Sequence, residues 1–376
     1  MVYEPLSMVT VAAFTDTYLP TVNGVAYTLR QWHEGWRRRG DRMDVVFPKA
    51  NGYDPDPGEH PVRSLPFPFY DGYRVASPSI PADVNGVELV HAHTPFSLGL
   101  AGLRLARKRG APFIASYHTP SDEYTNYLAP TDRLAAGLGR ISKAYERWFL
   151  DRADVVVVPS EATKRHLVER LGVEPPVRVI PNGVDLDLFE PADPVSLLDR
   201  HGIESDRPLV GYTGRHGYEK KLDELLVAAA DMEVTVLLGG DGPAREDLQR
   251  QADRVGIDAH FLGFLDRGEL PAFYSALDVF AFPSPVETQG LVALEANACG
   301  TPVVGCDSGA LADTVRDGET GYHYPRGDVE AFRDAIRRAL SDRDRLGQAC
   351  LDRREELSVE RSLSILSDLY RRLQNE

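Results

Sequence analysis

Short apolar runs alternate with amphipathic stretches along the whole chain. In the first half the apolar runs are continuous and rich in Val and Ile, which indicates strands buried on both faces. These runs are 9–14, 43–48, 89–93, 113–118, 154–160 and 177–183. Helical patterns fall between most of them, at 22–39, 97–109, 131–151 and 160–171. This alternation predicts a parallel sheet that carries helices on both sides.

The second half of the chain repeats this alternation of strand and helix patterns. Its predicted strands are 209–214, 234–240, 259–264, 278–284 and 301–306, with helices near 219–230, 243–256, 270–277, 290–298 and 328–340. We therefore predict an α/β protein of two doubly wound, Rossmann-like domains that face each other across a cleft. The boundary falls in the Pro- and Asp-rich stretch 181–194, which gives domains 1–183 and 184–356. The amphipathic end, 357–376, is expected to pack back on the first domain.

Length and composition agree with this organisation. A chain of 376 residues is too long for one ordinary core. Apolar runs stay far below the ~18 residues that a membrane span needs. The N-terminus lacks the basic region of a signal peptide, so we expect a cytoplasmic protein. The three cysteines have no metal-type spacing.

The net charge of −15 is distributed unevenly. Residues 1–183 hold 21 basic and 20 acidic side chains, a balance of +1, which leaves −16 for the rest. Nucleic-acid binding requires a basic surface, so an acidic chain argues against it. Only the first half can approach an anionic membrane without strong repulsion.

Ligands of parallel sheets bind at the carboxyl ends of the strands, so the segments after strands matter most. Gly24 lies where the first strand turns into a helix, and its small size would let an anion or a sugar approach the backbone. Arg215 and Lys220 bracket the corresponding turn of the second domain, in "TGRHGYEKKLDEL". Arg and Lys together suit a diphosphate, although such a pair is more often merely solvated.

Two glutamates follow the strand at 278–284. Glu287 lies in a loop and Glu295 in a helical pattern, in "ETQGLVALEANACGTPVV". The first carboxylate can accept hydrogen bonds from the hydroxyls of a sugar, and the second can bind a ribose diol. A nucleoside diphosphate sugar carries hydroxyls at both ends and phosphates between them, which accounts for this spacing.

At these residues the sequence resembles the retaining glycosyltransferases of family 4, which have the GT-B fold. The Glu-x7-Glu motif and the stretches "NGVAYTL", "GRHGYEKK", "GGDGP" and "FLGFLDRGELPAFYSALDVFAFPS" occur in the right order. The resemblance covers nearly the whole chain. Two further stretches, "HAHTPFSLGLAGL" and "YHTPSDEYTNYL", look most like glucosyltransferases that act on diacylglycerol-type lipids.

The resemblance implies a role for each matching residue. His118, Arg215, Lys220 and Glu287 would be catalytic: His118 near the reacting carbon, the two cations on the diphosphate, and Glu287 on the sugar hydroxyls. Glu295 would hold the ribose. The remaining donor-binding residues would be Gly24, Gly214, Gly240, Phe264, Leu265, Gln289, Gly290 and Leu291. Two positions depart from the family pattern: Lys221 replaces a common glycine, and Gln289 a common phenylalanine.

The acceptor side is less sharply defined. His91 and His93, at the end of a predicted strand, could equally be satisfied core groups or line the acceptor pocket, for which His93 and Tyr124 are candidates. In 131–151, an apolar stripe that includes Ile141 and Trp148 runs beside a basic stripe of Arg140, Lys143 and Arg147. An interfacial helix shows this pattern. Any helix that packs its apolar stripe on a sheet shows it too.

The sequence contains three Asp-x-Asp triplets, the metal-binding pattern of another glycosyltransferase fold. They are Asp54-Pro-Asp56, Asp185-Leu-Asp187 and Asp342-Arg-Asp344, in a loop, a linker and a helix end. We interpret all three as structural and expect neither a metal nor another cofactor.

The resulting hypothesis is the retaining transfer of a hexose, most simply glucose from a UDP-sugar, to a lipid hydroxyl such as that of diacylglycerol. The expected partners are a nucleotide sugar, a lipid acceptor and an anionic membrane, with the protein peripheral on the inner face of the cell membrane. One alternative is a GDP-mannose-dependent mannosyltransferase acting on a phosphoinositide, a polyprenyl-linked or a soluble glycan acceptor. An alternative of another class is a non-catalytic nucleotide-sugar-binding protein.

Overall fold

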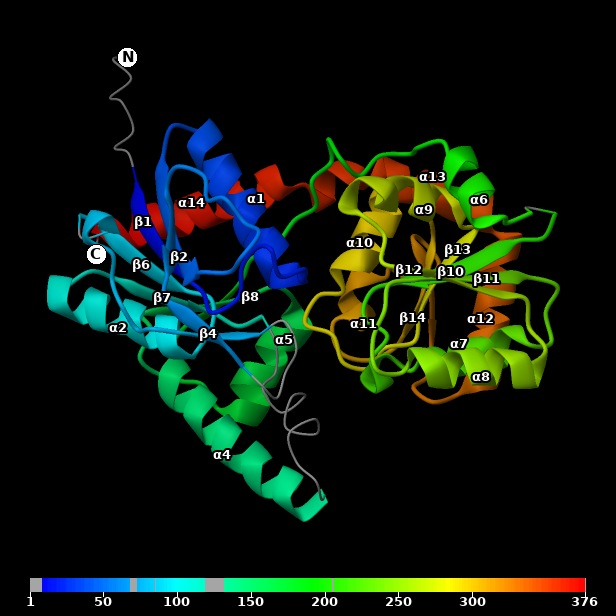
Figure 1. The fold of residues 1–376 in the computed structure, drawn as a ribbon, viewed down its shortest axis with the longest axis horizontal. Coiled ribbons are helices and arrows are strands. Elements are labelled where there is room, and N and C mark those ends of the chain that lie inside the picture. The colour runs from blue at the N-terminus through cyan, green and yellow to red at the C-terminus, as the bar shows by residue number, and fades with distance from the viewer. Residues whose placement is uncertain (1–8, 68–72, 85, 119–131, 205, 376) are drawn as a thin grey trace. The chain divides into compact units, whose positions relative to one another are not determined.

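The computed structural model describes residues 9–67, 73–84, 86–118, 132–204 and 206–375. The chain folds into two compact units (Figure 1). The first contains Met1–Asn182 together with Val359–Glu376, and the second contains Gly183–Ser358. The described residues include no helix that is long and apolar enough to cross a membrane.

The first unit is built on a parallel sheet with the strand order β3-β2-β1-β6-β7-β8-β9. A separate antiparallel hairpin, β4–β5, follows β3. The strands are β1 Thr10–Phe14, β2 Arg42–Pro48, β3 Glu59–Val62, β4 Ser64–Pro66, β5 Arg74–Ala76, β6 Leu89–Ala92, β7 Phe113–Ser116, β8 Val155–Val158 and β9 Val177–Val179. The helices are α1 Gly24–Arg38, η1 Ala82–Val84, α2 Ser97–Arg109, α4 Asp132–Leu150, α5 Glu161–Arg165, its π-helical continuation η2 His166–Leu171, and the terminal α14 Val359–Asn375.

Alternate residues of each strand pack on opposite faces of this sheet, as the period of a strand requires. Val11 and Ala13 belong to the core under α1 and α14, whereas Phe14 belongs to the core under α2. Figure 1 shows α14 lying along α1. The close packing depends on Gly35, because a Cβ there would lie 2.2 Å from Leu363 Cδ1.

The second unit has a six-stranded parallel sheet with the order β12-β11-β10-β13-β14-β15. Its strands are β10 Leu209–Thr213, β11 Thr235–Gly239, β12 Ala259–Gly263, β13 Val279–Phe282, β14 Val303–Cys306 and β15 Gly321–Tyr324. Its helices are α6 Val195–His201, η3 Tyr218–Lys220, α7 Leu222–Ala229, α8 Arg245–Val255, η4 Arg267–Glu269, α9 Leu270–Ala276, α10 Leu291–Ala298, α11 Leu311–Thr314, α12 Val329–Ser341, α13 Arg343–Asp352 and η5 Arg354–Leu357.

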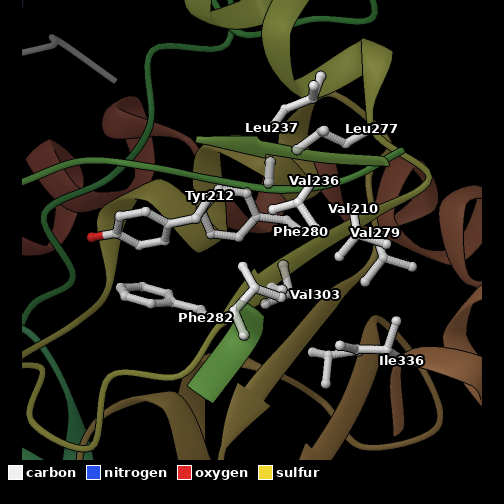
Figure 2. Packing of buried hydrophobic residues seen from close by; sticks show 14 of the residues in the cluster. Val210, Tyr212, Val236, Leu237, Leu277, Val279, Phe280, Phe282, Val303 and Ile336 are labelled. Carbon is white, nitrogen blue, oxygen red and sulfur yellow. The ribbon is translucent and has the colours of Figure 1, made fainter. Parts of the chain in front are cut away.

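Aromatic and branched aliphatic side chains fill the core of the second unit (Figure 2). The ring of Tyr212 lies 5.8 Å from that of Phe280 and 5.5 Å from that of Phe282, measured between centroids. Val210, Val279 and Val303 come from three adjacent strands, and Ile336 on α12 belongs to the same core. The short apolar runs of the second half therefore supply the strands around which this core is built.

The predicted fold class is confirmed: each unit is a doubly wound α/β domain with a parallel sheet. All eleven runs predicted as strands contain one. The prediction missed the edge strands β3 and β15 and the hairpin β4–β5, as well as the helices α6, α11 and α13. The sequences "EHPV" and "GYHY" of the two edge strands lack the continuous Val/Ile pattern that marks a strand buried on both faces.

The strand order of each sheet reverses direction once. In the first unit this happens between β1 and β6, and in the second between β10 and β13. Ligands of doubly wound domains bind at the carboxyl ends of the strands beside such a reversal. A ligand-binding site is therefore expected in the segments that follow these four strands.

Candidate active site

The reversal in the second sheet brings Lys220 and Glu287 together. Lys220 ends the short helix η3 after β10, and Glu287 lies in the loop after β13. Lys220 Nζ donates a hydrogen bond of 2.6 Å to Glu287 Oε1. Their side chains are 18% and 14% exposed, so the ion pair is largely withdrawn from water. The sequence placed both residues at the carboxyl edge of the sheet but did not predict this contact.

Arg215 also has an acidic partner on the same edge. Its Nη1 lies 3.4 Å from Glu219 Oε1, and its side chain is 37% exposed. The four charged groups of the two ion pairs all act on the hydroxyl of Tyr212. Burial raises the pKa of this hydroxyl well above its usual range, so it remains protonated and can donate a hydrogen bond. Glu219 and Tyr212 are members of this cluster that sequence reasoning missed.

The loops after β10 and β11 pack tightly on each other through glycines. Gly240 has φ of 103°, and a Cβ at this position would lie 2.0 Å from the carbonyl oxygen of Gly214. The Gly214 N–H donates to Gly239 O at 3.1 Å, and the Gly240 N–H donates to Gly263 O at 2.6 Å. Only glycine permits this approach and this backbone conformation. The predicted residues Gly214 and Gly240 thus shape the edge of the site.

Lys221 adopts a left-handed backbone conformation, with φ of 55°. Among the described residues it is the only non-glycine with a positive φ. It lies between η3 and α7, where the resemblance led us to note that glycine is common. The backbone conformation explains that preference, because a Cβ in this region costs roughly 1–2 kcal/mol.

Gln289, Gly290 and Leu291 form the entrance to α10. Gly290 has φ of 77° and precedes the first helical residue, so it cannot cap the helix with a side chain. A Cβ on Gly290 would lie 2.8 Å from Leu311 Cδ2. Gln289 is buried, and its carbonyl oxygen accepts a hydrogen bond of 2.6 Å from Thr314 Oγ1. The start of a helix is a backbone site that suits an oxygen-rich ligand.

Glu295 lies on α10 and is only 4% exposed. Its Oε2 accepts a hydrogen bond of 2.9 Å from the hydroxyl of Tyr274, and its Oε1 lies 3.3 Å from Arg267 Nη1. Burial raises the pKa of Glu295, while Arg267 and Tyr274 act in the opposite direction. Sequence reasoning did not single out Arg267 or Tyr274, although both lie in a stretch that carries the family resemblance.

Phe264 and Leu265 follow β12 and differ in their surroundings. Phe264 is 60% exposed, whereas Leu265 is buried in the core of the unit. The resemblance assigns backbone groups of these residues to the base of the donor, and the structure places both at the carboxyl edge of the sheet.

In the first unit, His93 and His118 lie next to each other at the ends of β6 and β7. His93 Nδ1 and His118 Nε2 are 3.0 Å apart, and the two rings are within 14° of parallel. Burial lowers the pKa of His118 to about 4 and that of His93 well below its usual range, so both rings are neutral at pH 7. His93 is only 2% exposed, so it does not lie on an open surface.

His91 is a satisfied core group. Its Nδ1 is 2.6 Å from the Tyr370 hydroxyl on α14, and its Nε2 is 2.8 Å from Ser116 Oγ.

Gly24 begins α1 and is exposed. The preceding Asn23 caps the helix by accepting a hydrogen bond of 2.9 Å from the Ala26 N–H. Tyr124 lies outside the described residues.

The exposed face of α4 corrects one sequence-based interpretation. Ile141 and Trp148 are 69% and 42% exposed, so this part of the predicted apolar stripe does not pack on the sheet. The helix instead buries Phe149 and Leu150, because its contact face is offset from that stripe. The ring of Trp148 stacks on that of Tyr145 at 5.7 Å. The predicted basic residues Arg140, Lys143 and Arg147 are exposed.

The Asp-x-Asp triplets make contacts within the protein. Asp56 lies 2.6 Å from Arg30, Asp185 Oδ1 accepts from the Asp187 N–H, and Asp342 lies 2.8 Å from Arg345. Within the described parts of the chain, no group of three or more His, Cys, Asp or Glu residues could hold a metal ion.

Two Rossmann-like domains in one chain, with these residues at the carboxyl edges of their sheets, are typical of the GT-B glycosyltransferases. The sucrose-phosphate synthase of Thermosynechococcus elongatus superimposes with a TM-score of 0.80 at 25% identity, over 97% of this chain and 99% of that chain. The sequence matches Glycosyltransferase Family 4 over residues 22–188 and Glycosyl transferases group 1 over residues 197–356. The chain belongs to glycosyltransferase family 4.

Two similar proteins act on different substrates, as their names state. The alpha-monoglucosyldiacylglycerol synthase of Streptococcus pneumoniae is 32% identical over 84% of this chain and 75% of that protein. The GDP-mannose-dependent alpha-mannosyltransferase of Mycobacterium tuberculosis is 31% identical over 91% of this chain and 90% of that protein. The class of enzyme is therefore a glycosyltransferase, while the donor and the acceptor differ among its relatives.

Proposed function

We propose that the protein transfers glucose from UDP-glucose to the hydroxyl of a diacylglycerol-type lipid, with retention of the anomeric configuration. The observation that carries this proposal is the ion pair of Lys220 and Glu287, with Arg215 nearby, at the reversal of the second sheet. A diphosphate next to a sugar requires cations and a hydroxyl acceptor side by side. The choice of a lipid acceptor is supported by the similar glucosyldiacylglycerol synthase.

In the proposed reaction the acceptor oxygen bonds to the anomeric carbon on the face from which the nucleoside diphosphate leaves. The bond between that carbon and the β-phosphate oxygen breaks, and the proton of the acceptor hydroxyl passes to this phosphate oxygen. Arg215 and Lys220 stabilise the charge that develops on the diphosphate, which is the kind of term that dominates many enzymatic rates. Glu287 accepts hydrogen bonds from the sugar hydroxyls, and His118 contacts the sugar.

We propose that no metal ion takes part. Arg215 and Lys220 are cations at this edge of the sheet that can donate hydrogen bonds to the diphosphate in place of a divalent ion. The acidic triplets that could suggest a metal site are engaged with Arg30, with the local backbone and with Arg345. The enzyme should therefore retain its activity in EDTA.

We also propose that the exposed face of α4 touches an anionic membrane from the cytoplasmic side. Trp148 and Ile141 project an aromatic and an aliphatic side chain from this face, beside exposed basic residues. Trp and Tyr favour the interface between lipid and water, and basic residues favour anionic head groups. A lipid acceptor would be reached from such a surface.

The second candidate is a mannosyltransferase that uses GDP-mannose. It is favoured by the similarity to the mycobacterial alpha-mannosyltransferase, which extends over 91% of this chain. Because the two candidates share the diphosphate chemistry, the residues described above do not separate them.

The experiment is a measurement of nucleoside diphosphate release from UDP-glucose and from GDP-mannose, with and without diacylglycerol in mixed micelles. We expect UDP release that requires the lipid and survives EDTA. Lipid-dependent GDP release from GDP-mannose alone would favour the second candidate. If neither donor turns over with any lipid offered, the proposed function is wrong.

A further inference from the structure

The surroundings of Glu295 point to a residue that positions the donor nucleotide. Arg267, in η4, places its guanidinium 3.3 Å from Glu295 Oε1 and over the ring of Phe189, 4.8 Å from its centroid. Tyr274, on α9, binds the other carboxylate oxygen at 2.9 Å. Two elements that precede β13, η4 and α9, thus hold a carboxylate of α10, the helix that follows β13.

A buried carboxylate is costly unless a cation and hydrogen bonds compensate for the loss of water. Glu295 is 4% exposed, and its side chain faces Arg267, Tyr274 and Cys299. Burial raises the pKa of Cys299 to about 12 and keeps the Tyr274 hydroxyl protonated, so both groups are neutral. The positive charge beside Glu295 is therefore that of Arg267.

The Glu295 carboxylate has more acceptor positions than Arg267 and Tyr274 occupy. An ionised carboxylate offers about four lone-pair positions, two on each oxygen. Arg267 uses one position on Oε1, and Tyr274 uses one on Oε2. One position remains on each oxygen, which is the arrangement that two neighbouring hydroxyls require. A protonated Glu295 would lose one of these two acceptors.

We propose that Arg267 is a positioning residue for the donor: with Tyr274 it keeps the Glu295 carboxylate ionised and oriented, so that both ribose hydroxyls can bind to it. The assignment of the ribose rests on the proposed function. The coupling between Arg267 and Glu295 is independent of that function and can be measured without a nucleotide.

The first experiment compares the free energy of unfolding of the wild type, Arg267→Met, Glu295→Gln and the double variant between pH 5.5 and 8. Without Arg267, the folded-state pKa of Glu295 lies further above its unfolded value. The stability of Arg267→Met relative to the wild type should therefore decrease as the pH rises. The double variant should show no such extra slope relative to Glu295→Gln. Identical slopes for the wild type and Arg267→Met would overturn the proposal.

The second experiment measures the binding of UDP and GDP by calorimetry at pH 6.5 and 8.5. Arg267→Met should bind about tenfold more weakly than the wild type at pH 6.5 and regain affinity relative to it at pH 8.5, as Glu295 ionises. Arg267→Lys should be less impaired because it retains the charge. A matched control is Arg333→Met, which removes an arginine of similar exposure that pairs with Asp231.

The outcomes separate the two proposals. Arg267→Met could instead bind the nucleotides more weakly than the wild type by the same factor at both pH values. The arginine would then act on the nucleotide or on the fold without controlling the charge of Glu295, and this result would overturn the inference. If the wild type binds neither nucleotide, the proposed function fails, while the unfolding measurements still decide whether Arg267 controls Glu295. Should Arg267→Met not fold, Arg267→Gln removes the same charge, keeps a polar side chain and provides the same comparison.

Discussion

Lys220 and Glu287 form a 2.6 Å ion pair although 67 positions separate them in the sequence. Their strands, β10 and β13, are neighbours in the sheet. The pair joins the two halves of the doubly wound sheet at its reversal. The pair thereby holds together the two side chains that the proposed function assigns to the diphosphate and to the sugar.

Replacement of either cation at this edge should lower turnover strongly. Removing one charged donor from a developing anion typically costs about 2.7–4 kcal/mol, or roughly a hundred- to a thousandfold in rate. We expect losses of this size in kcat for Arg215→Ala and for Lys220→Ala, from steady-state assays with the donor at saturation. Near-normal turnover in both variants would contradict the assignment. Arg250→Ala, which removes an exposed ion pair on α8, is a suitable control.

His93 should act on the reaction through His118. The 3.0 Å contact between the two rings orients His118, and the loss of one hydrogen bond of about 1–1.5 kcal/mol corresponds to about a tenfold effect. We expect His93→Leu to lower kcat by about this factor without changing the affinity for the nucleotide. His93→Asn places an amide close to the position of Nδ1 and should recover part of the activity. Equal losses in the two variants would mean that the size of the ring matters and the hydrogen bond does not.

The buried histidines should make the first unit sensitive to acid. Burial lowers the pKa of His118 to about 4, and those of His91 and His93 also lie well below the ordinary value of about 6.5. The unfolded chain therefore binds more protons than the folded one once the pH falls below about 6.5. The contribution of these histidines to the free energy of unfolding is therefore fully present above this pH and declines as the pH falls toward 4.

Chemical denaturation at pH 7 and at pH 5 tests this expectation. The free energy of unfolding of the wild type should be lower at pH 5. The difference between the two pH values should be smaller in His93→Leu, which lacks one of the neutral histidines. A wild type equally stable at both pH values would contradict the neutral state of these rings.

The face of α4 should determine membrane binding. Changing Arg140 and Lys143 to Glu reverses two exposed charges and should reduce binding to anionic liposomes, with little effect on the thermal midpoint. Arg147 is a less clean target because it lies 3.3 Å from Asp151 and 3.4 Å from Glu174. The same reversal at Arg104 and Arg107 on α2, both exposed, is the matched control. Unaltered liposome binding in a folded α4 variant would exclude this face.

The sequence predicts the elements better than their contacts. Continuous Val and Ile runs identify central strands because such runs are stable only where both faces are covered. The offset on α4 could not be predicted, because Tyr145 and Trp148 and the buried Phe149 and Leu150 follow each other within two turns of one helix. Tyr145 and Trp148 lie three positions apart, as do the buried Glu146 and Phe149, and this period alone does not say which face meets the sheet.

The same distinction holds at the site. Glu287 and Glu295 are recognisable by their spacing, because a single loop and helix present them. Their partners Lys220, Arg267 and Tyr274 come from other elements, and only the folded sheet brings them within reach. Lys221 is a different case. From the sequence alone it is only a departure from the glycine that is common at this position, whereas its left-handed backbone conformation explains why glycine is favoured there.

Transfer of a hexose to a lipid hydroxyl is the activity proposed for this chain. It is tested most directly by mass spectrometry of the lipids formed when the protein, UDP-glucose and diacylglycerol are incubated together, with Glu287→Ala in parallel. The account predicts a lipid product heavier by one hexose, with an α-linkage by NMR, and no product from the variant. A wild-type reaction that yields only free glucose, or no hexosylated lipid from any nucleotide sugar tried, would contradict it.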